Sequence, residues 1–425
     1  MSGLERLIRN SVVGTILSRV AYLYYTRVFT PIKAFIVRRK NKIKVIFIIT
    51  ELGMWKSEAL YLKMLEHPRF NPVIRVLPSP ENLDAMEPII QYLQGKGFDY
   101  RTLSPDESLK TEMKADIIFY PKPYVTSYYP KQNFFRNRYA LFCYIVYGFH
   151  NIVSDFICNQ PYHNYAWQTY FENHSAAVDT AKAMMNKGRN IKVTGLPMED
   201  AFRKPLSSYN DCWKKQEYPK KRIIWAPHFS FAKDSILNYS TFLEYYDTML
   251  NLAEKYKNQV QFAFKPHPLL RPHLNEHWGE ERTDSYYERW ANMENAQLEL
   301  GQYIDLFMTS DALIHDCSSF TNEYMYTSKP VMYLLRGSAE IHCSQLNSYS
   351  REAFNLHYFG RSDSDIEAFI VDVLNGVDPY RDPREKYYEK YLSPINGKSA
   401  CDNIINAILG DIDKSNLSSS SNSIA

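Results

Sequence analysis

The sequence predicts an α/β protein with two parallel sheets, and two features of its 425 residues lead to this expectation. Short runs rich in β-branched residues alternate with longer amphipathic segments, which is typical of parallel strands joined by helices. This alternation occurs twice, on either side of a polar connector at residues 204–221 that contains Pro205 and Pro219. Hydrophobic residues make up 45% and charged residues 23% of the chain, so a disordered or fibrous protein is excluded.

The first half, residues 43–203, begins with the strongest strand signal, the β-branched run at residues 43–50. A helical pattern follows and stops at Pro68, and a second helix is expected at residues 84–96. Because strands and helices alternate, we expect one parallel sheet. Its further strands are expected at residues 73–77, 115–120, 141–146, 165–170 and 192–194.

The second half, residues 222–413, repeats the pattern. Its strands are expected at residues 222–226, 260–264, 313–314 and 331–335, and its helices at 240–256, 364–375 and 401–409. The serine-rich residues 414–425 predict a disordered tail. Ligands bind at the carboxyl ends of parallel strands, so the expected site lies where the two Rossmann-like lobes face a central cleft.

Residues 1–42 form a basic arm. Residues 1–44 contain ten Lys and Arg residues and one acid, whereas the remaining 381 residues contain 40 bases and 46 acids. Apolar residues recur at helical spacing, but Arg19 and Arg27 interrupt every window long enough to span a bilayer. One interpretation is an amphipathic helix on the anionic cytoplasmic face of a membrane, and the other is a basic helix packed on the body. Since the body carries no basic stripe, nucleic acid is not an expected partner.

No metal or other cofactor is expected. The six Cys residues include no CxxC pair, which favours reduced thiols over a disulfide framework or a zinc site. His273 and His277 are four residues apart but lack the glutamate of a zinc-binding HExxH motif. No glycine-rich phosphate loop occurs, so side chains and helix ends must hold any phosphate.

Three histidines follow predicted strands. His150 follows the strand at residues 141–146, His228 lies in Ala226-Pro227-His228, and His267 lies between two prolines in Lys265-Pro-His-Pro268. An imidazole at a strand end can donate to a phosphate or accept a hydroxyl proton near neutral pH. The alternative is that each histidine caps a strand or packs there.

A fourth candidate region follows the strand at residues 312–315. Asp316 ends this strand, and Ser318 and Ser319 open a helix whose start can bind an anion through hydroxyl and backbone N–H groups. Glu323 lies one turn inside, within reach of a ribose hydroxyl. The alternative is that Asp316 and the serines only cap the helix.

From about residue 140 to residue 408, the order of these motifs resembles the CDP-glycerol glycerophosphotransferases, the teichoic-acid primases and polymerases. The resemblance rests on several short segments in one order. They are Gly148-Phe-His150, Thr194-Gly-Leu-Pro197, Trp225-Ala-Pro-His-Phe229, Lys265-Pro-His-Pro268, Ser310-Asp311, Asp316-Cys-Ser-Ser319, Glu323 and Lys329-Pro330. The resemblance implies a glycosyltransferase-B-type fold. It also implies transfer of a polyol phosphate, glycerol phosphate foremost, from a CDP-linked donor to a hydroxyl of a lipid-linked or polymeric glycan, with release of CMP.

The resemblance also implies roles for these residues. His150 becomes the general base on the acceptor hydroxyl, and His267, aided by Arg271, neutralises the donor pyrophosphate. Ser318 and Ser319 hold phosphate, and Glu323 holds the ribose. The remaining donor-site candidates are Pro227, His228 and Asp316.

Two other functions stay open. One is a glycosyltransferase of the same fold that uses a nucleotide sugar, and the other is a non-catalytic membrane scaffold for polysaccharide assembly. The scaffold is an alternative because Asn151-Ile152 follows His150 where the family has Gly-Thr. Release of CMP, of a nucleoside diphosphate or of no nucleotide separates the three.

Overall fold

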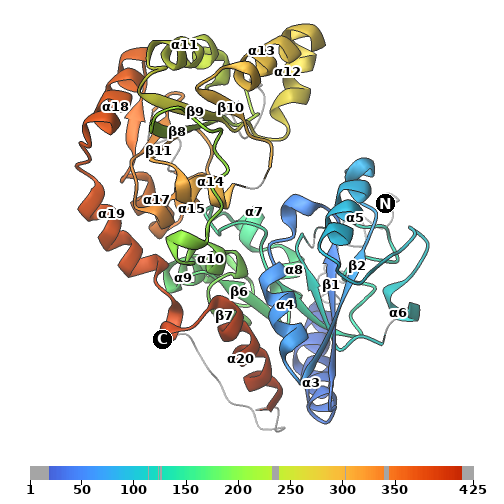
Figure 1. Cartoon of the computed structure of the whole chain (residues 1–425). Helices are drawn as coiled ribbons and strands as arrows, with labels where there is room; N and C mark the ends of the chain where they lie inside the picture. Colours follow the sequence, from blue (N-terminus) through green and yellow to red (C-terminus); the bar gives the residue numbers. More distant parts are fainter. Residues whose placement is uncertain are drawn as a thin grey trace. The chain divides into compact units, whose positions relative to one another are not determined.

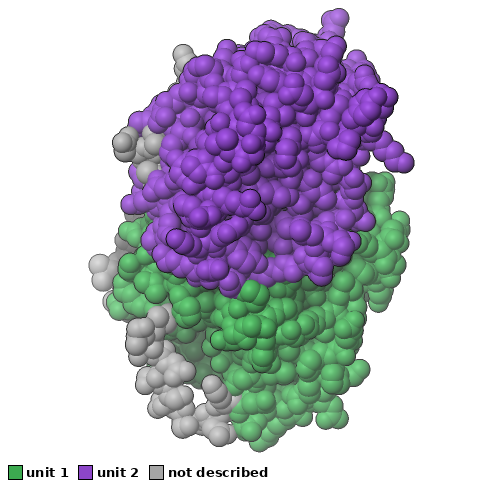
Figure 2. All heavy atoms as spheres, turned by 60° about the vertical axis from the view of Figure 1, so that its left-hand side comes forward, with its two compact units in different colours: residues 1–200, 394–425 green, residues 201–393 purple. Residues whose placement is uncertain are grey.

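The computed structural model describes residues 19–112, 114–122, 124, 127–231, 239–301, 303–338 and 344–413. Residues 1–18 of the basic arm and the serine-rich tail therefore lie outside the described residues. The chain forms two compact units, residues 1–200 with 394–425 and residues 201–393, which we call unit 1 and unit 2 (Figure 2). Each unit contains one parallel sheet, which confirms the predicted fold class.

Unit 1 contains a seven-stranded sheet in the order β3-β2-β1-β4-β5-β6-β7 (Figure 1). The β-branched run Ile43–Ile49 forms the interior strand β1 and is buried along almost its whole length, as expected for a parallel strand covered on both faces. Phe47 of β1 stacks on Phe119 of β4 with ring centroids 4.8 Å apart. The other strands are β2 (Phe70–Val76), β3 (Tyr100–Thr102), β4 (Ile117–Tyr120), β5 (Leu141–Tyr144), β6 (Gln168–Phe171) and β7 (Ile191–Val193).

Most helices of unit 1 connect these strands, and α20 (Ala400–Asp413) is the last helix of the chain. The connecting helices are α4 (Glu58–Glu66), α5 (Met86–Gly95), α6 (Leu109–Glu112), α7 (Asp155–Cys158), α8 (Pro161–Tyr165) and α9 (His174–Ala183), and α10 (Pro197–Phe202) leads into unit 2.

Unit 2 contains a six-stranded sheet in the order β10-β9-β8-β11-β12-β13. Its core is aromatic, with Trp225 of β8 stacked on Phe264 of β9 at 5.0 Å and packed beside Trp290. The strands are β8 (Lys221–Ala226), β9 (Val260–Phe264), β10 (Ala296–Leu298), β11 (Ala312–His315), β12 (Val331–Leu334) and β13 (Tyr358–Gly360). The helices are α11 (Phe242–Lys255), α12 (Leu270–Trp278), α13 (Glu280–Asn292), α14 (Ile304–Thr309), α15 (Phe320–Glu323), α17 (Ser348–Phe354), α18 (Asp363–Asn375) and α19 (Arg381–Tyr387).

The C-terminal helix corrects one expected boundary. Residues 394–413 were expected in the second lobe, but α20 belongs to unit 1. The Asp200 carboxylate accepts hydrogen bonds from the first two backbone N–H groups of α20, and Gln168 of β6 donates to the Ala407 carbonyl near its end. Gly195 allows this approach, because a Cβ at this position would lie 2.9 Å from the Cβ of Ala400.

The polar stretch at residues 204–221 is not a free connector, which corrects a second expectation. Trp213 is buried, and its indole N–H donates to the Thr309 hydroxyl at 3.0 Å. The Lys214 backbone N–H donates to the Gln297 side chain. Lys221 already belongs to β8, so this stretch is part of unit 2.

Residues 19–38 form what we call the arm helix, which includes the π-helical turn η1 (Tyr25–Phe29) and α3 (Thr30–Arg38). One face packs on unit 1 through the buried residues Tyr25, Ala34 and Val37. Lys33 and Lys40 pair with the buried Asp116 carboxylate at 3.1 Å and 2.7 Å. The described part of the arm thus packs on the body. Within the described part of the chain, no helix is long and apolar enough to cross a membrane.

Candidate functional site

Both sheets have a point where the strand order reverses. In unit 2 the chain runs outward from β8 through β9 to β10, then returns to place β11 on the other side of β8. In unit 1 the same reversal occurs between β1 and β4. Open parallel sheets bind ligands outside the carboxyl ends of the strands at such a point. His228 follows β8, His267 follows β9 and Asp316 follows β11, so three predicted residues meet at the reversal in unit 2.

The Asp316 carboxylate links the segment after β8 to the residue before α11 by hydrogen bonds. It is fully buried and accepts hydrogen bonds from the His228 backbone N–H at 2.6 Å and from the backbone N–H and hydroxyl of Thr241 at 2.7 Å and 2.9 Å. Burial raises the pKa of Asp316 to about 6, although these hydrogen bonds oppose the shift. The Asp316 carboxylate thus positions the His228 loop.

His228 and His267 form a pair of neutral imidazoles whose ring centroids are 5.0 Å apart. Burial lowers the pKa of His228 to about 3 and that of His267 to about 4. The Lys265 ammonium lowers the pKa of His267 further, and a proton on the His267 ring would oppose one on His228. The Nδ1 atom of His267 accepts the Leu269 backbone N–H at 3.1 Å, and that of His228 accepts the Ser230 backbone N–H at 3.3 Å. Both rings therefore carry their proton on Nε2, which leaves two N–H donors for an anion.

Backbone contacts fix this histidine pair. The His267 backbone N–H donates to the Pro227 carbonyl, and the His228 carbonyl accepts the Ser240 hydroxyl at 2.6 Å. Pro227 therefore contributes through its backbone. Phe229 packs against both rings, and its ring centroid lies 4.4 Å from that of His228 and 4.6 Å from that of His267.

Ser318 and Ser319 lie at the start of a very short helix, α15, and both side chains are partly exposed. Ser319 makes no side-chain cap hydrogen bond, and its hydroxyl contacts the Cys317 thiol at 3.3 Å. The Ser319 side chain therefore does not cap α15. Glu323 is buried and interacts with the Tyr303 hydroxyl, and burial followed by the Glu323 charge raises the pKa of that tyrosine.

Arg271 does not join this cluster through its charged group. Its guanidinium pairs with Asp284 of α13 at 2.6 Å and stacks over the Tyr287 ring at 5.3 Å. Two other cations border the cluster instead. Lys265 follows β9, is nearly buried and donates to the Gly301 carbonyl, and Arg336 follows β12 and contacts the Ser240 carbonyl. The sequence analysis missed Arg336, although its place two residues after β12 is the same signal that identified the histidines.

We call His228, His267, Lys265, Ser318 and Ser319 the switch-point cluster. It offers two neutral N–H donors, an ammonium group and two hydroxyl groups, and the neighbouring Asp316 carboxylate already accepts three hydrogen bonds from protein groups. Such a donor set suits a diphosphate, because each group can donate to a phosphate oxygen. Among the described residues, no group of three His, Cys, Asp or Glu side chains could hold a metal ion.

His150 lies in unit 1 and has a partner that the sequence analysis did not identify. Its Nδ1 atom lies 2.7 Å from Oε2 of Glu172, and its backbone N–H donates to Oε1 of the same carboxylate at 2.9 Å. Glu172 is 1% exposed and directly follows β6, and the His150 ring stacks on the adjacent Phe171 at 3.7 Å. The carboxylate holds the proton on Nδ1, which makes Nε2 the proton-accepting nitrogen.

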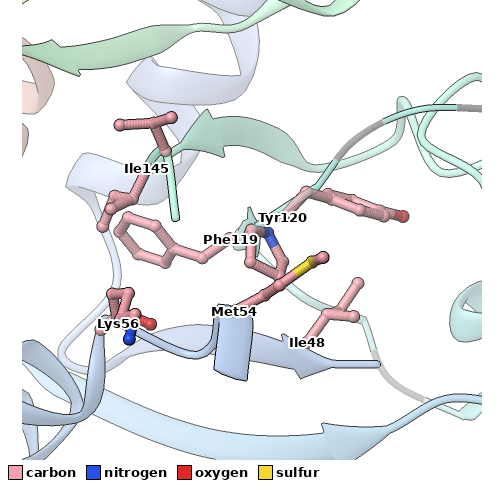
Figure 3. A pocket seen from close by; sticks show the side chains of 9 residues that line it. Ile48, Met54, Lys56, Phe119, Tyr120 and Ile145 are labelled. Carbon is pink, nitrogen blue, oxygen red and sulfur yellow. The ribbon is translucent and has the colours of Figure 1, made fainter. Parts of the chain in front are cut away.

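A small hollow lies at the strand reversal of unit 1, beside the carboxyl ends of β1, β4 and β5, and measures about 240 Å³ including space open to solvent. Figure 3 shows Ile48, Met54, Phe119 and Ile145 around it, with Lys56 at its side. Ile145 and Val146 line the hollow and belong to the segment that leads from β5 to His150. The two predicted histidines thus follow strands of different sheets. His150 follows β5, which pairs with β4 at the reversal in unit 1, and His267 follows β9, which pairs with β8 at the reversal in unit 2.

Comparisons with known proteins agree with these motifs. The family model described as CDP-Glycerol:Poly(glycerophosphate) glycerophosphotransferase matches residues 161–408, more than half of the chain. The switch-point cluster lies inside the matched range, and His150 precedes it.

Curated relatives include a teichoic acid ribitol-phosphate polymerase of Staphylococcus aureus, which is 24% identical over 232 residues, 52% of this chain and 39% of the relative. A teichoic acid ribitol-phosphate primase of Bacillus spizizenii is 22% identical over 261 residues, 58% of this chain and 60% of the relative. The chain thus spans between about two fifths and three fifths of these relatives.

Solved structures share the fold at low identity. The wall teichoic acid polymerase TagF matches with a TM-score of 0.60 at 14% identity, covering 95% of this chain and 99% of that one. A putative UDP-N-acetylglucosamine 2-epimerase from Listeria monocytogenes matches with a TM-score of 0.55 at 14% identity, covering 87% and 96%. The extent of the family match confirms the resemblance: the chain belongs to the CDP-glycerol:poly(glycerophosphate) glycerophosphotransferase family.

Proposed function

We propose that this protein transfers a polyol phosphate from a CDP-linked donor to an acceptor hydroxyl and releases CMP, in the synthesis of a cell-surface polymer or capsular polysaccharide. The observation that carries the proposal is the switch-point cluster, which gathers donors for a diphosphate inside the range that matches the family. Glycerol phosphate is the foremost polyol.

In the proposed reaction the acceptor oxygen attacks the phosphorus that bears the polyol. The bond between this phosphorus and the oxygen bridging to the CMP phosphate breaks, and CMP leaves with the bonding electrons. Phosphoryl transfer depends mainly on positioning and charge stabilisation. The Nε2–H groups of His228 and His267, with the Lys265 ammonium, are assigned to the charge that develops on the leaving CMP. Ser318 and Ser319 are assigned to the phosphate oxygens.

His150 is assigned as the general base. Its Nε2 atom takes the proton of the attacking hydroxyl, and the Glu172 carboxylate, 2.7 Å from Nδ1, stabilises the imidazolium that forms. The same dyad speaks against a purely structural protein, because a scaffold has no need of a buried carboxylate that fixes the histidine tautomer. The hollow beside β1, β4 and β5 is the proposed acceptor side of the reaction.

Glu323 keeps its proposed role at the donor ribose, and for this role its carboxylate must exchange the Tyr303 hydroxyl for a ribose hydroxyl. Arg271 is assigned a lesser role than the resemblance implies, since its guanidinium already pairs with Asp284. Lys265 is the cation that the geometry favours in its place, since Arg336 also pairs with a carboxylate, that of Glu244 at 3.4 Å.

The arm helix is proposed to rest on the anionic cytoplasmic face of a membrane, where a lipid-linked or polymeric glycan acceptor would be found. Val20, Tyr24, Val28, Ile32 and Ile36 are four residues apart and between 42% and 62% exposed, and we call this row the apolar stripe. The stripe lies opposite the face that packs on unit 1. An amphipathic helix with basic flanks binds such a surface through apolar burial and charge attraction together.

The proposed function is tested by incubating the purified protein with CDP-glycerol, CDP-ribitol and common nucleotide sugars, and identifying the nucleotide released. Release of CMP supports the polyol-phosphate transfer. Release of a nucleoside diphosphate would support a glycosyltransferase instead, and no release with any donor and a membrane acceptor fraction would support the scaffold.

A further inference from the structure

A second hollow in unit 1 lies at the edge of the sheet opposite the reversal point. It measures about 600 Å³, including space open to solvent. Its walls come from the segments that precede β6 and β7, from the arm helix and from the end of α20, and Figure 1 places α3 and α20 at this lower edge of the sheet. Because these are the amino ends of the strands, the hollow is separate from the proposed reaction site, which lies at the carboxyl ends.

The hollow has an excess of positive charge. Arg27 of the arm helix, Arg189 and Lys192 line it, against one carboxylate, Asp411. Asp411 is already engaged, since it pairs with Lys192 at 2.7 Å and accepts a hydrogen bond from Gln168. Among the described residues, no carboxylate forms an ion pair with Arg27 or Arg189. Two guanidinium charges thus remain uncompensated.

Both guanidinium groups line the same hollow, which Tyr22 also lines. Both act on the phenol of Tyr22: burial raises the pKa of Tyr22, and the charges of Arg189 and Arg27 oppose this rise. Bringing two cations to one place costs free energy unless an anion lies between them. Guanidinium groups bind carboxylates and phosphates in bidentate fashion, and a phosphate has more acceptor oxygens than a carboxylate, so one phosphate can accept from both arginines.

The surroundings indicate which phosphate. The apolar stripe passes directly beside Arg27, since Val28 is its next residue and is 42% exposed. Trp167 lines the hollow and is half-buried, and an indole ring suits a boundary between apolar tails and water. A ligand with a phosphate next to acyl chains matches both features, whereas a free nucleotide has no acyl chain that could contact the apolar stripe.

We propose that this basic hollow, defined by Arg27, Arg189, Lys192 and Trp167, binds the phosphate of an anionic glycerophospholipid while the apolar stripe contacts the bilayer. The inference rests on the proposed membrane contact of the arm helix and adds a defined headgroup site to it. Arg189 lies between α9 and β7, outside the arm, so general attraction by the basic arm does not require it.

The test compares Arg189→Ala with Arg136→Ala in the full chain. Arg136 is a matched control, because it is also exposed, lies in unit 1 outside the arm and has no ion-pair partner among the described residues. Flotation is measured with vesicles of phosphatidylcholine alone and with about 30% phosphatidylglycerol added. We expect Arg189→Ala to weaken binding to the anionic vesicles about tenfold or more, beyond the roughly fivefold loss of one surface charge, and Arg136→Ala to have little effect.

A second measurement uses a soluble short-chain phosphatidylglycerol and follows tryptophan fluorescence. We expect a change that is lost in Arg189→Ala and in Trp167→Phe, and absent with short-chain phosphatidylcholine or with inorganic phosphate at equal ionic strength. A response to inorganic phosphate would overturn the lipid assignment and leave a free-phosphate site. Equal vesicle binding by both arginine variants would overturn the hollow as a site.

The outcomes for the hollow and for the proposed function can be told apart. CMP release with a soluble acceptor should be unchanged in Arg189→Ala, because this residue lies outside the reaction site. If the wild type fails to bind vesicles yet binds the short-chain lipid through Arg189, the arm proposal fails and the hollow stands.

Discussion

The contact between His150 and Glu172 gives the sharpest mutational prediction. Glu172→Gln keeps the size of the side chain and removes its charge. The carboxylate is 1% exposed, lies 2.7 Å from Nδ1 and accepts the His150 backbone N–H at 2.9 Å. A hydrogen bond to a charged group contributes about 1.5–3 kcal/mol. If this stabilisation acts on the imidazolium formed in the transition state, turnover falls by about 10- to 150-fold.

The assay is CMP release at saturating donor, together with the donor dissociation constant by calorimetry. Glu172→Gln should lower turnover and leave the donor dissociation constant nearly unchanged, since the dyad lies in unit 1 and the donor cluster in unit 2. His150→Ala should cost about 10²–10⁴-fold in turnover. Because Glu172 acts through His150, the double variant should be no slower than His150→Ala alone.

Glu199→Gln is the matched control. Glu199 is another buried carboxylate of unit 1, and it accepts a hydrogen bond from the Leu196 backbone N–H at 2.8 Å. Its loss should lower the melting temperature without the turnover defect. The reasoning is refuted if Glu172→Gln retains more than half of the wild-type turnover, or if it weakens donor binding as strongly as it slows the reaction.

Four further predictions concern the switch-point cluster, the buried Asp316 carboxylate, the buried histidines His163 and His357, and the arm helix. His267→Ala should weaken CDP binding about tenfold or more in calorimetry, whereas Arg271→Ala should change it little because its guanidinium pairs with Asp284. Asp316→Asn should lower unfolding stability by about 1–3 kcal/mol in a denaturant titration and weaken CDP binding, since one amide oxygen cannot serve all three donors. Burial lowers the pKa of both His163 and His357 to about 3, so the unfolded chain binds their protons at a higher pH than the folded protein does. Each histidine therefore lowers the free energy of unfolding by up to about 1.4 kcal/mol per pH unit as the pH falls below about 6.5. His357→Gln should flatten the fall in melting temperature from pH 7 to 5, and an unchanged slope would contradict this. Val28→Glu with Ile32→Glu should abolish vesicle binding at an unchanged melting temperature, because both side chains are exposed; retained binding would contradict the role of the stripe.

The sequence predicted most strands of both sheets because these are local, buried runs, but it did not predict the three-residue strands β3, β10 and β13. Ile43–Ile49 and Lys221–Ala226 are recognisable from β-branched and apolar residues alone, and histidines that follow such strands must lie at the carboxyl edge. His228 and His267 thus could be found without knowing which strands are neighbours. Their neutral state and their shared protonation on Nε2 depend on burial and on backbone donors, which a sequence does not display.

Long-range contacts explain what the sequence did not reveal. Glu172 reaches His150 only because β5 and β6 pair with Cys143 opposite Gln168, and nothing near Glu172 signals that register. The C-terminal helix follows unit 2 in the chain but packs on unit 1, where its partner Gln168 is 239 residues away from Ala407. Asp316 was expected to contact the donor, but its carboxylate is buried and accepts a hydrogen bond from the Thr241 hydroxyl, 75 residues away in the sequence.

The central claim is that a CDP-linked polyol phosphate is the donor, and nucleotide release tests it most directly. The wild-type protein, with an acceptor glycan supplied, is incubated separately with CDP-glycerol, CDP-ribitol and UDP-linked sugars, and the nucleotide products are separated and identified. The account predicts CMP from at least one CDP-polyol, no release from the UDP-sugars, and loss of CMP release in His267→Ala at an unchanged melting temperature. Release of UDP, or CMP release that His267→Ala leaves intact, would contradict it.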